Sequence, residues 1–561
     1  MRSLDRRTFL TGSAAAAAGL LLFAGFESPA HADEVLTGYP GSIPLRRARF
    51  ENWDGAIVAD QLWTAVPRNA TDVVALVNWA HSAGYTIRPQ GHRHTWSPLT
   101  VAPGTAGNKK VLLVDTTSKL TAMSMADAET VRVQAGASME KLLRFIESNG
   151  RSLTAAPAPG DVTVGGVLAV GGHGTAIPSL DELGKPGTIW GSMSNLVSSL
   201  TAVVWDAKSG SYVERTFDRT DTDCAAFLTH LGRAFITEVT LKTVPAYMLR
   251  CQNFTNIPIS ELFAKPDKVT NRSLSKLIDA SGRVGVIWYA FTDKPWVQVW
   301  TRSANKPFTS RRTLGPFNYL FADNLPTPVP QLLGNLVEGH AEVAPAFNAA
   351  VALATSTGLD VTFARDMWGP ASHFLHFVKP TTLRVTAGSH VIVTRRSEVQ
   401  AVVHEFTSHY TAMLDDYRRR GMFPINSGVE IRVTGVDSAM EYGPNADAPA
   451  LSAATAVPGH PEWDTAIWLD TLTLPDTPHQ SEFYRELERT YFVEFPAERG
   501  VVRAEWAKRW GHTNDGAWLD TDTLRTRIPA SYPKWDSAVE TLARWDPHRI
   551  FTTELLDQLM P

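Results

Sequence analysis

Two histidines that flank an arginine are the residues of this chain best suited to reactive chemistry. His92, Arg93 and His94 follow a glycine in the segment RPQGHRH, residues 88–94. The segment follows a strand predicted over residues 85–89. An imidazole nitrogen is a nucleophile and a proton carrier near neutral pH. The spacing therefore predicts a reactive imidazole at the end of a strand.

A glycine-rich stretch farther along supplies backbone instead of side chains. PAPG, residues 157–160, is followed by VGGVLAVGGHG, residues 164–174. Glycine lets backbone approach a ligand closely or turn with positive φ. Backbone N–H groups in such loops, or at a helix N-terminus, can hold a pyrophosphate. A reactive imidazole and a pyrophosphate site together predict a bound flavin.

A carboxylate and a guanidinium alternate along a third predicted element. Glu430 and Arg432 lie two residues apart in GVEIRVT, residues 428–434, a predicted strand. A period of two places both on one face, with Val429, Ile431 and Val433 on the other. Such a pair can be a tunable acid/base pair or a structural salt bridge.

The first two motifs resemble the FAD-binding domain of the vanillyl-alcohol oxidase and p-cresol methylhydroxylase flavoproteins. That family has R-P-x-G-x-x-H followed by V-G-G-x-L-A-x-G-x-H-G. In members with covalent flavin, a histidine of the first motif is bonded to the 8α carbon of FAD. The match implies His94 for this bond, with His92 as the alternative; an ordinary hydrogen-bonding His94 would mean a noncovalent flavoprotein. His173 is expected to support its loop.

The resemblance implies a wider set of FAD contacts. Besides His94, they are Pro89, Gln90, Gly91, His92, Arg93, Gly160, Val164, Gly165, Gly166, Gly171, Gly174, Gly191, Ser192, Phe235 and Ile236.

Further motifs are similar to one subfamily, the class II cholesterol oxidases, which carry covalent FAD. They lie at 191–197, 287–296, 315–319, 321–326, 429–432, 466–469, 505–508 and 546–551, and with the first two they extend over nearly all of the mature chain. The resemblance implies oxidation of the 3-hydroxyl of cholesterol or a related sterol to the ketone, a Δ5 to Δ4 isomerisation, and reduction of O₂ to H₂O₂.

The resemblance also implies residue roles. Glu430 would take the hydroxyl proton and then shuttle a proton between carbons, while Arg432 would keep it charged and stabilise negative charge on the substrate oxygen. Lys508 would stabilise the reduced, anionic flavin; the alternative is a surface lysine.

Three positions depart from the subfamily. Gly285 and Ala387 stand where it has acidic residues, and Asp470 stands where it has asparagine. Asp470 is the next candidate base if Glu430 is only structural. The departures keep two alternatives open: an oxidase or dehydrogenase of the same fold for a sugar, polyol or secondary metabolite, and a non-enzymatic flavin-bearing sterol-binding protein. The expected aromatic pocket favours a large apolar substrate; it comprises Trp288, Tyr289, Trp296 and Trp368.

Composition limits the other function classes. The 561 residues, 44% hydrophobic and 20% charged, suffice for more than one core. A net charge of −4, with no basic run in the mature part, argues against nucleic-acid binding. Cys224 and Cys251 form either one bridge or two buried apolar positions, and no metal motif occurs. Oligomeric state is left open.

The first 32 residues are expected to be an export signal peptide rather than part of the fold. SLDRRTFL fits a twin-arginine signal, an apolar run follows over residues 14–26, and AHA at 30–32 offers a cleavage site. The run is short for a membrane span, although an uncleaved anchor is the alternative. We expect a secreted enzyme that contacts a membrane surface transiently to obtain sterol.

The predicted elements that position these residues indicate an α+β protein with two domains after the signal. Residues 33–245 are expected to form a two-subdomain FAD-binding domain, with strands at 110–115, 130–135, 200–205 and 235–242 and helices at 71–81, capped by Thr71, and at 138–148. Residues 246–490 are expected to form an α+β substrate-binding domain, with strands at 283–289 and 296–300 and helical patterns at 331–357 and 396–420. Residues 491–561 return to the FAD domain.

Overall fold

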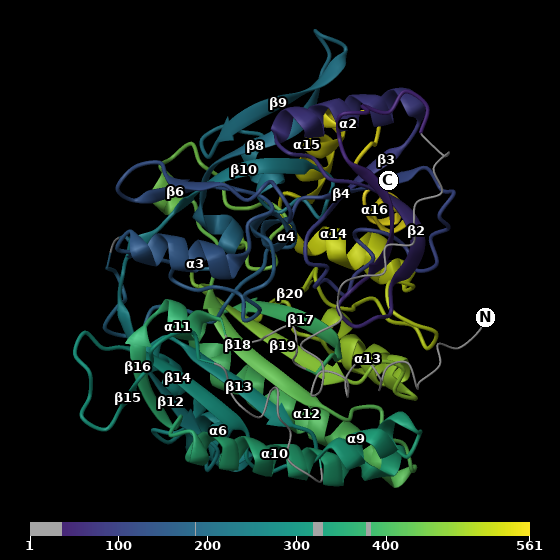
Figure 1. The fold of residues 1–561 in the computed structure, drawn as a ribbon. Coiled ribbons are helices and arrows are strands. Elements are labelled where there is room, and N and C mark those ends of the chain that lie inside the picture. The colour runs from purple at the N-terminus through teal and green to yellow at the C-terminus, as the bar shows by residue number, and fades with distance from the viewer. Residues whose placement is uncertain (1–35, 186, 318–328, 377–382) are drawn as a thin grey trace.

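The computed structural model describes residues 36–185, 187–317, 329–376 and 383–561 (Figure 1). The predicted signal at 1–32 and the motif at 321–326 therefore lie outside the described residues. Within the described ranges, no helix is both long and apolar enough to cross a membrane.

A four-stranded sheet begins the chain. Its order is β1 (Leu45–Glu51), β2 (Val58–Ala65), β4 (Val111–Asp115) and β3 (Thr86–Gln90), and β4 pairs in parallel with both neighbours. Helix α2 (Ala70–Ala83) connects β2 to β3 and buries Leu76, Val77 and Ala80 in the core it shares with this sheet.

The start of α2 corrects one expectation. Asn69, not Thr71, is the N-cap, because its side-chain oxygen accepts the Asp72 N–H at 3.0 Å. Asparagine caps at least as well as threonine, and apolar periodicity does not fix the first turn.

A five-stranded antiparallel sheet completes the FAD-binding half, in the upper part of Figure 1. Its order is β5 (Met123–Met125), β6 (Thr130–Gln134), β10 (Phe235–Lys242), β8 (Val197–Asp206) and β9 (Ser211–Asp218). Helices α3 (Met139–Ser148) and α4 (Val164–Ala169) pack in the same core. Ser138 and Thr163 cap them through their hydroxyl groups.

A nine-stranded sheet forms the other half, in the lower part of Figure 1. Its order is β15 (Arg311–Arg312), β16 (Asp366–Pro370), β12 (Met248–Phe254), β14 (Trp296–Arg302), β13 (Val284–Tyr289), β18 (Gly428–Gly435), β19 (Thr465–Thr473), β17 (Thr386–Thr394) and β20 (Gly500–Ala504). Only the β15–β16 pair is parallel.

Helices cover the face of this sheet that is turned away from the FAD-binding half (Figure 1). They include α9 (Val329–Val337), α10 (Ala344–Val361) and α12 (Val399–Arg419). The pattern expected over 331–357 is thus two helices, separated by a short turn at Ala341–Val343. Phe406 and Tyr410 of α12 pack with Val429 and Ile431 of β18. The opposite face of the sheet is left for the FAD-binding half.

The last segment contributes to both halves. After β20, helices α14 (Ile528–Ser531), α15 (Trp535–Trp545) and α16 (Glu554–Leu559) run through the FAD-binding half. Trp506, Tyr532 and Leu556 belong to the same core as α3 and α4. The overall architecture confirms the expected α+β fold with an FAD-binding and a substrate-binding domain.

The cysteines follow the second of their two alternatives. No disulfide joins them in the part of the chain that the structure describes, and the two thiols are buried in different cores. Burial raises the pKa of Cys224 to about 12, so this thiol is protonated at neutral pH.

Candidate active site

A cavity of about 320 Å³ lies between the two halves. One wall is formed by residues 88–96, 157–173 and 230–236, and the other carries charged side chains of the large sheet and of residues 505–508. Of the sequence-predicted residues, those on its lining are Pro89, Gln90, Gly91, His92, Arg93, His94, Gly165, Gly166, Ile236, Glu430, Arg432 and Lys508.

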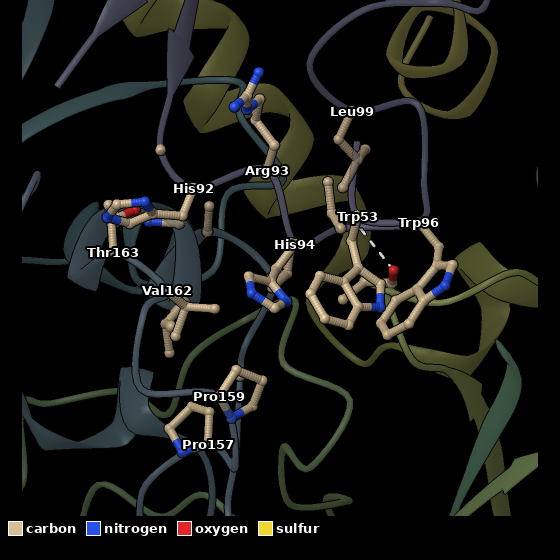
Figure 2. A pocket seen from close by; sticks show the side chains of 18 of the residues that line it. Trp53, His92, Arg93, His94, Trp96, Leu99, Pro157, Pro159, Val162 and Thr163 are labelled. Atoms are coloured by element: carbon tan, nitrogen blue, oxygen red, sulfur yellow. Dashed lines mark hydrogen bonds between the residues drawn. The ribbon is translucent and has the colours of Figure 1, made fainter. Parts of the chain in front are cut away.

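His94 is held in a defined orientation on this lining. Its Nε2 lies 3.0 Å from Oδ1 of Asp161, and its ring stacks on Trp53 with centroids 4.5 Å apart (Figure 2). Burial alone would raise the pKa of Asp161, but the hydrogen bond and charge of His94 lower it overall. When the ring is neutral, a carboxylate that accepts Nε2–H leaves Nδ1 as the nitrogen with the free lone pair.

The turn between the two histidines sends their side chains in different directions. Arg93 has φ of 61°, in the left-handed region, and its carbonyl accepts the Trp53 N–H at 2.8 Å. Such a conformation costs about 1–3 kcal/mol and persists where the surroundings enforce it. Figure 2 shows His92 beside Thr163 and the Arg93 side chain pointing away from His94. Burial lowers the pKa of His92.

Backbone forms much of this wall, and glycine is required there. A Cβ added at Gly91 would lie 2.3 Å from Oγ1 of Thr163, and one added at Gly165 would lie 2.8 Å from Cβ of Ala135. The strand end at 88–94 is thus packed directly onto the start of α4. Main-chain groups can therefore approach the cavity closely at these positions, as a dinucleotide cofactor requires.

His230 is a lining residue that the sequence did not indicate. Its Nδ1 accepts the Gly232 N–H at 3.2 Å, so the proton of the neutral ring is on Nε2. That Nε2 is buried and has no partner among the described residues. Burial, with a smaller contribution from Arg88, lowers the pKa of His230 to about 3. A neutral donor without a protein partner on this wall fits a polar group of bound FAD. No motif around His230 could have shown this.

Seven predicted FAD contacts do not reach the lining: Gly160, Val164, Gly171, Gly174, Gly191, Ser192 and Phe235. Phe235 belongs to the core under α2, because strand alternation turns Phe235 inward and the neighbouring Ile236 toward the cavity. Val164 packs in the core around α3.

The glycines among them shape the chain behind the wall. Gly171 has a φ of 62°, and a Cβ at Gly174 would lie 2.5 Å from the Ala156 carbonyl oxygen. A Cβ at Gly160 would lie 2.8 Å from the ring of His376. These positions need glycine for turning and packing.

Gly191 and Ser192 join the two halves. The Ser192 N–H and hydroxyl donate to the two carboxylate oxygens of Asp437, at 2.6 and 2.9 Å. A Cβ at Gly191 would lie 2.1 Å from the same carboxylate. This motif therefore anchors the substrate-binding half rather than lining the cavity.

The opposite wall begins with Glu430 and Arg432 on β18. They share one face and are hydrogen-bonded to each other, while Val429, Ile431 and Val433 are buried on the helix side. Burial alone would lower the pKa of Arg432, but the charges of Glu430 and Asp470 raise it above its ordinary value. The pair faces the cavity and is not on an exposed sheet surface, contrary to the structural alternative.

Asp470 and Lys508 extend the charged wall. Lys508 Nζ lies 2.9 Å from Oδ2 of Asp470 and 4.5 Å from the ring centre of Trp96. Its side chain is 10% exposed, so the surface-lysine alternative is wrong. Burial alone would lower the pKa of Lys508, but the charges of Asp470, Glu505 and Glu430 together raise it.

Asp470 is not on the lining, although its neighbours are. Its side chain is fully buried, opposite Glu430 in the β18–β19 ladder, with Oδ2 3.2 Å from Nη1 of Arg432. Burial opposes ionisation, but the charges of Lys508 and Arg432 hold the pKa of Asp470 well below its usual range. Asp470 is thus placed to stabilise the charged forms of Arg432 and Lys508.

Two further side chains on the cavity lining were missed as chemical groups. His173 stacks on Trp468 at 3.5 Å, donates from Nδ1 to the Gly174 carbonyl at 2.9 Å, and has Nε2 3.6 Å from Oε1 of Glu505. It supports its loop as expected but also lines the cavity. Glu505 lines it too, three residues before Lys508, a spacing in the EWAK motif that could have indicated it.

The departures at Gly285 and Ala387 have packing explanations. Gly285 lies opposite Arg432 in the β13–β18 ladder, and a Cβ there would lie 3.0 Å from Trp300. Ala387 is fully buried, and its carbonyl accepts the Arg509 N–H at 2.8 Å. Neither position offers a carboxylate to the cavity.

The expected aromatic pocket is wrong. None of its four members reaches the cavity lining. Trp288 packs under α12, and the hydroxyl of Tyr289 is bound to Thr355 of α10 at 2.8 Å. Trp296 is core, and the Trp368 indole donates to the Ser303 carbonyl. The sequence showed that these four residues are aromatic but not on which face of the sheet they lie. Apolar lining comes instead from Trp53, Trp96, Leu383, Val385 and Leu472.

Comparisons with known proteins agree with this geometry. A family model described as "Cholesterol oxidase, substrate-binding" matches residues 248–561, and one described as "FAD binding domain" matches residues 63–206. Among curated proteins, L-galactono-1,4-lactone dehydrogenase of Brassica oleracea and D-arabinono-1,4-lactone oxidase of Eremothecium gossypii are each 28% identical over 142 residues, which is 25% of this chain. The match spans 23% and 26% of these relatives, about a quarter of their length.

Solved structures match over the whole fold. A solvent-stable cholesterol oxidase is 46% identical with a TM-score of 0.91, covering 94% of this chain and 100% of that one. A cholesterol oxidase from B. sterolicum is 38% identical with the same TM-score, covering 94% and 99%. With a substrate-binding family model over more than half of its length and an FAD-binding model before it, this chain belongs to the cholesterol oxidase family of flavoproteins.

Proposed function

We propose that this protein is an FAD-dependent alcohol oxidase that converts the 3-hydroxyl of cholesterol or a related sterol to the ketone and reduces O₂ to H₂O₂. The observation that carries the proposal is the array of Glu430, Arg432 and Lys508 on the cavity wall that faces the glycine-built wall. Bound FAD supplies the hydride acceptor and the electrons that reduce O₂.

Glu430 serves as the base in this proposal. It holds the proton lost from the substrate hydroxyl, while Arg432 keeps the carboxylate charged before transfer and stabilises negative charge on the substrate oxygen. The same carboxyl can carry a proton between carbons, which moves a Δ5 double bond to Δ4. Lys508, buried and cationic, offers positive charge to the cavity.

We further propose that the flavin is covalently attached through His94. The support is the orientation of the ring, whose Nε2 is held by Asp161 so that Nδ1 is the nitrogen left for the bond to the flavin. Wild-type protein precipitated with acid should keep its yellow colour, and His94→Ala should release it. His92→Ala, the matched control in the same segment, should keep it. Loss of colour from precipitated wild type would contradict the attachment.

The substrate class follows from the apolar part of the lining. Leu383, Val385 and Leu472 line the cavity together with Trp53 and Trp96, and the Trp96 indole donates to the Val385 carbonyl at 2.8 Å. Such a lining suits a sterol better than a sugar or polyol. Because sterols are held in membranes, the enzyme would contact a membrane surface transiently, and export by the twin-arginine route would bring it there already folded.

A peroxidase-coupled assay tests the reaction directly. Cholesterol and other 3-hydroxysteroids should give H₂O₂ and the ketone in equal amounts, with little product from sugars and polyols. Peroxide from polyols but not sterols would favour the alternative alcohol.

Replacing Arg6 and Arg7 by lysine should retain the protein in the cell, and unchanged export would contradict the twin-arginine route.

A further inference from the structure

Two buried carboxyl groups meet at one hydroxyl group. Oγ of Ser389 lies 2.6 Å from Oδ1 of Asp470 and 2.8 Å from Oε2 of Glu505. A serine hydroxyl has one hydrogen and donates one good hydrogen bond, whereas its lone pairs accept. If both carboxyls were ionised, one contact would join two acceptors. A protonated carboxyl that donates to Oγ satisfies both contacts.

The net charge around this pair also indicates that one carboxyl of the cluster is protonated. Three carboxyls, Glu430, Asp470 and Glu505, share the wall with two cations, Arg432 and Lys508, and all five side chains are less than one-fifth exposed. Uncompensated negative charge in a poorly solvated site is costly, and protonation of one carboxyl relieves it. One proton makes this cluster neutral.

The distances identify Glu505 as the carboxyl that holds the proton. Asp470 is the better stabilised anion, because both Lys508 at 2.9 Å and Arg432 at 3.2 Å contact its Oδ2. Glu505 has one cation, Lys508, at 4.0 Å. Two like charges joined through one hydroxyl ionise in sequence, and the less stabilised one keeps the proton.

The other titratable groups around the pair agree with this assignment. His173 Nδ1 must carry hydrogen because it faces the Gly174 carbonyl, so in the neutral tautomer Nε2 is an acceptor turned toward Glu505 at 3.6 Å, where it can receive the Glu505 proton in a hydrogen bond. On β17, burial lowers the pKa of His390 to about 3, which keeps it uncharged. Arg509 is engaged by Asp54 at 2.7 Å.

We propose that Asp470 and Glu505 share one proton through Ser389, with Glu505 as the protonated member, so that the cavity wall presents a neutral carboxylic acid beside Lys508. Asp470 is then a positioning residue: its negative charge keeps Glu505 protonated and balances the two cations. The use of this proton in turnover rests on the proposed function, but the protonation itself does not.

Infrared spectra of the resting holoenzyme at neutral pH test the proposal without any substrate. A carbonyl band of a protonated carboxylic acid should shift when glutamate is ¹³C-labelled and disappear in Glu505→Gln. Asp437 is a second buried carboxyl whose pKa is raised by burial, and any band from it would follow ¹³C-aspartate instead. Glu182→Gln, a matched control at a glutamate whose pKa Arg283 helps to lower, should leave the glutamic band unchanged.

Asp470→Asn gives the sharper test, because it leaves Glu505 in place. Without its anionic neighbour, Glu505 becomes the only counter-charge within 4.0 Å of Lys508 and should ionise, so the glutamic band should be lost. A purely structural Asp470 would not change the protonation of another residue. Ser389→Ala should shift the band, since it removes the hydroxyl oxygen that accepts the hydrogen bond from the protonated Glu505.

Four results would overturn the proposal. A glutamic band that survives Glu505→Gln, or one that persists in Asp470→Asn, would do so. So would a band that follows ¹³C-aspartate and disappears only in Asp470→Asn, which would place the proton on Asp470. Absence of any glutamic band would overturn it as well and would identify His173 as the cation that balances the cluster. Because these readouts need no alcohol, failure of the sterol assay would leave them unaffected.

Discussion

The two walls of the cavity differ in the chemical groups that form them. The FAD-side wall depends on closely packed main chain, with Gly91 and Gly165 placed where a Cβ would clash. The substrate-side wall consists of charged side chains that depend on one another, with Asp470 contacting both Lys508 and Arg432. Flavin binding by the FAD-side wall should therefore be lost when atoms are added. Catalysis by the substrate-side wall should be lost when a charge or a proton is changed without any change of shape.

The largest expected effect is on the charged wall. Glu430→Gln keeps the shape and removes the base, so the rate of sterol oxidation should fall by roughly 10²–10⁴-fold, the usual contribution of a positioned general base. Flavin absorbance should be unchanged, because Glu430 is hydrogen-bonded to Arg432 and lies on the wall opposite the glycines. Turnover at the wild-type rate would make Glu430 a structural partner of Arg432, with Asp470 the next base to test.

The complementary change adds one methyl group to the FAD-side wall. Gly91→Ala forces Thr163 to move, with a cost of about 1–3 kcal/mol for overpacking, and displaces the cap of α4. The ratio of flavin to protein should fall sharply. Gly41→Ala, where a Cβ has nothing within 4 Å, is the control and should bind flavin normally. Full flavin content in Gly91→Ala would show that this wall tolerates added atoms.

The same contrast explains what could be predicted from the sequence. The FAD-side wall is encoded in contiguous segments, so RPQGHRH and VGGVLAVGGHG identified His94, Gly91, Gly165 and Gly166 on the lining. Within those segments the sequence could not tell a glycine that faces the ligand from one that turns the chain. Gly171, with its φ of 62°, shows the difference.

The charged wall needs information that the sequence does not contain. Alternation placed Glu430 and Arg432 on one face, but the position of Asp470 beside them depends on the register of β18 and β19, where it lies opposite Glu430. Ser389 comes from β17, about 40 residues before β18 in the chain. Trp288 and Trp296 were misplaced for the same reason, because tryptophan is equally acceptable on either face of a covered sheet.

A smaller effect is expected at His230, whose buried Nε2 on the FAD-side wall has no protein partner among the described residues. In a His94→Ala background, where binding can be reversible, His230→Phe should weaken FAD binding roughly fivefold, about 1 kcal/mol for one neutral hydrogen bond. Flavin fluorescence during titration of apoprotein measures the Kd. His340→Phe, at an exposed histidine, is the control. An unchanged Kd in His230→Phe would mean that its Nε2–H serves no cofactor group.

The smallest effect concerns stability and compares one buried imidazole behind each wall. Burial lowers the pKa of His230 and of His390 from 6.5 to about 3. Between pH 6.5 and 3 the unfolded chain therefore binds more protons at these sites than the folded protein does. The stabilisation is fully present above pH 6.5 and is lost as the pH falls toward 3, by about 1.4 kcal/mol per pH unit and per histidine.

Urea unfolding at a series of pH values gives the slope of stability against pH, and His390→Asn and His230→Phe should each reduce it by about one proton. Since His390 packs on Tyr491 and Phe406, away from the cavity, its variant should keep the flavin, whereas the His230 variant should lose part of it. An unchanged slope in His390→Asn would mean that this imidazole is protonated in the fold. The cluster around Asp470 and Glu505 would then contain one more positive charge, and charge balance would no longer require a proton on Glu505.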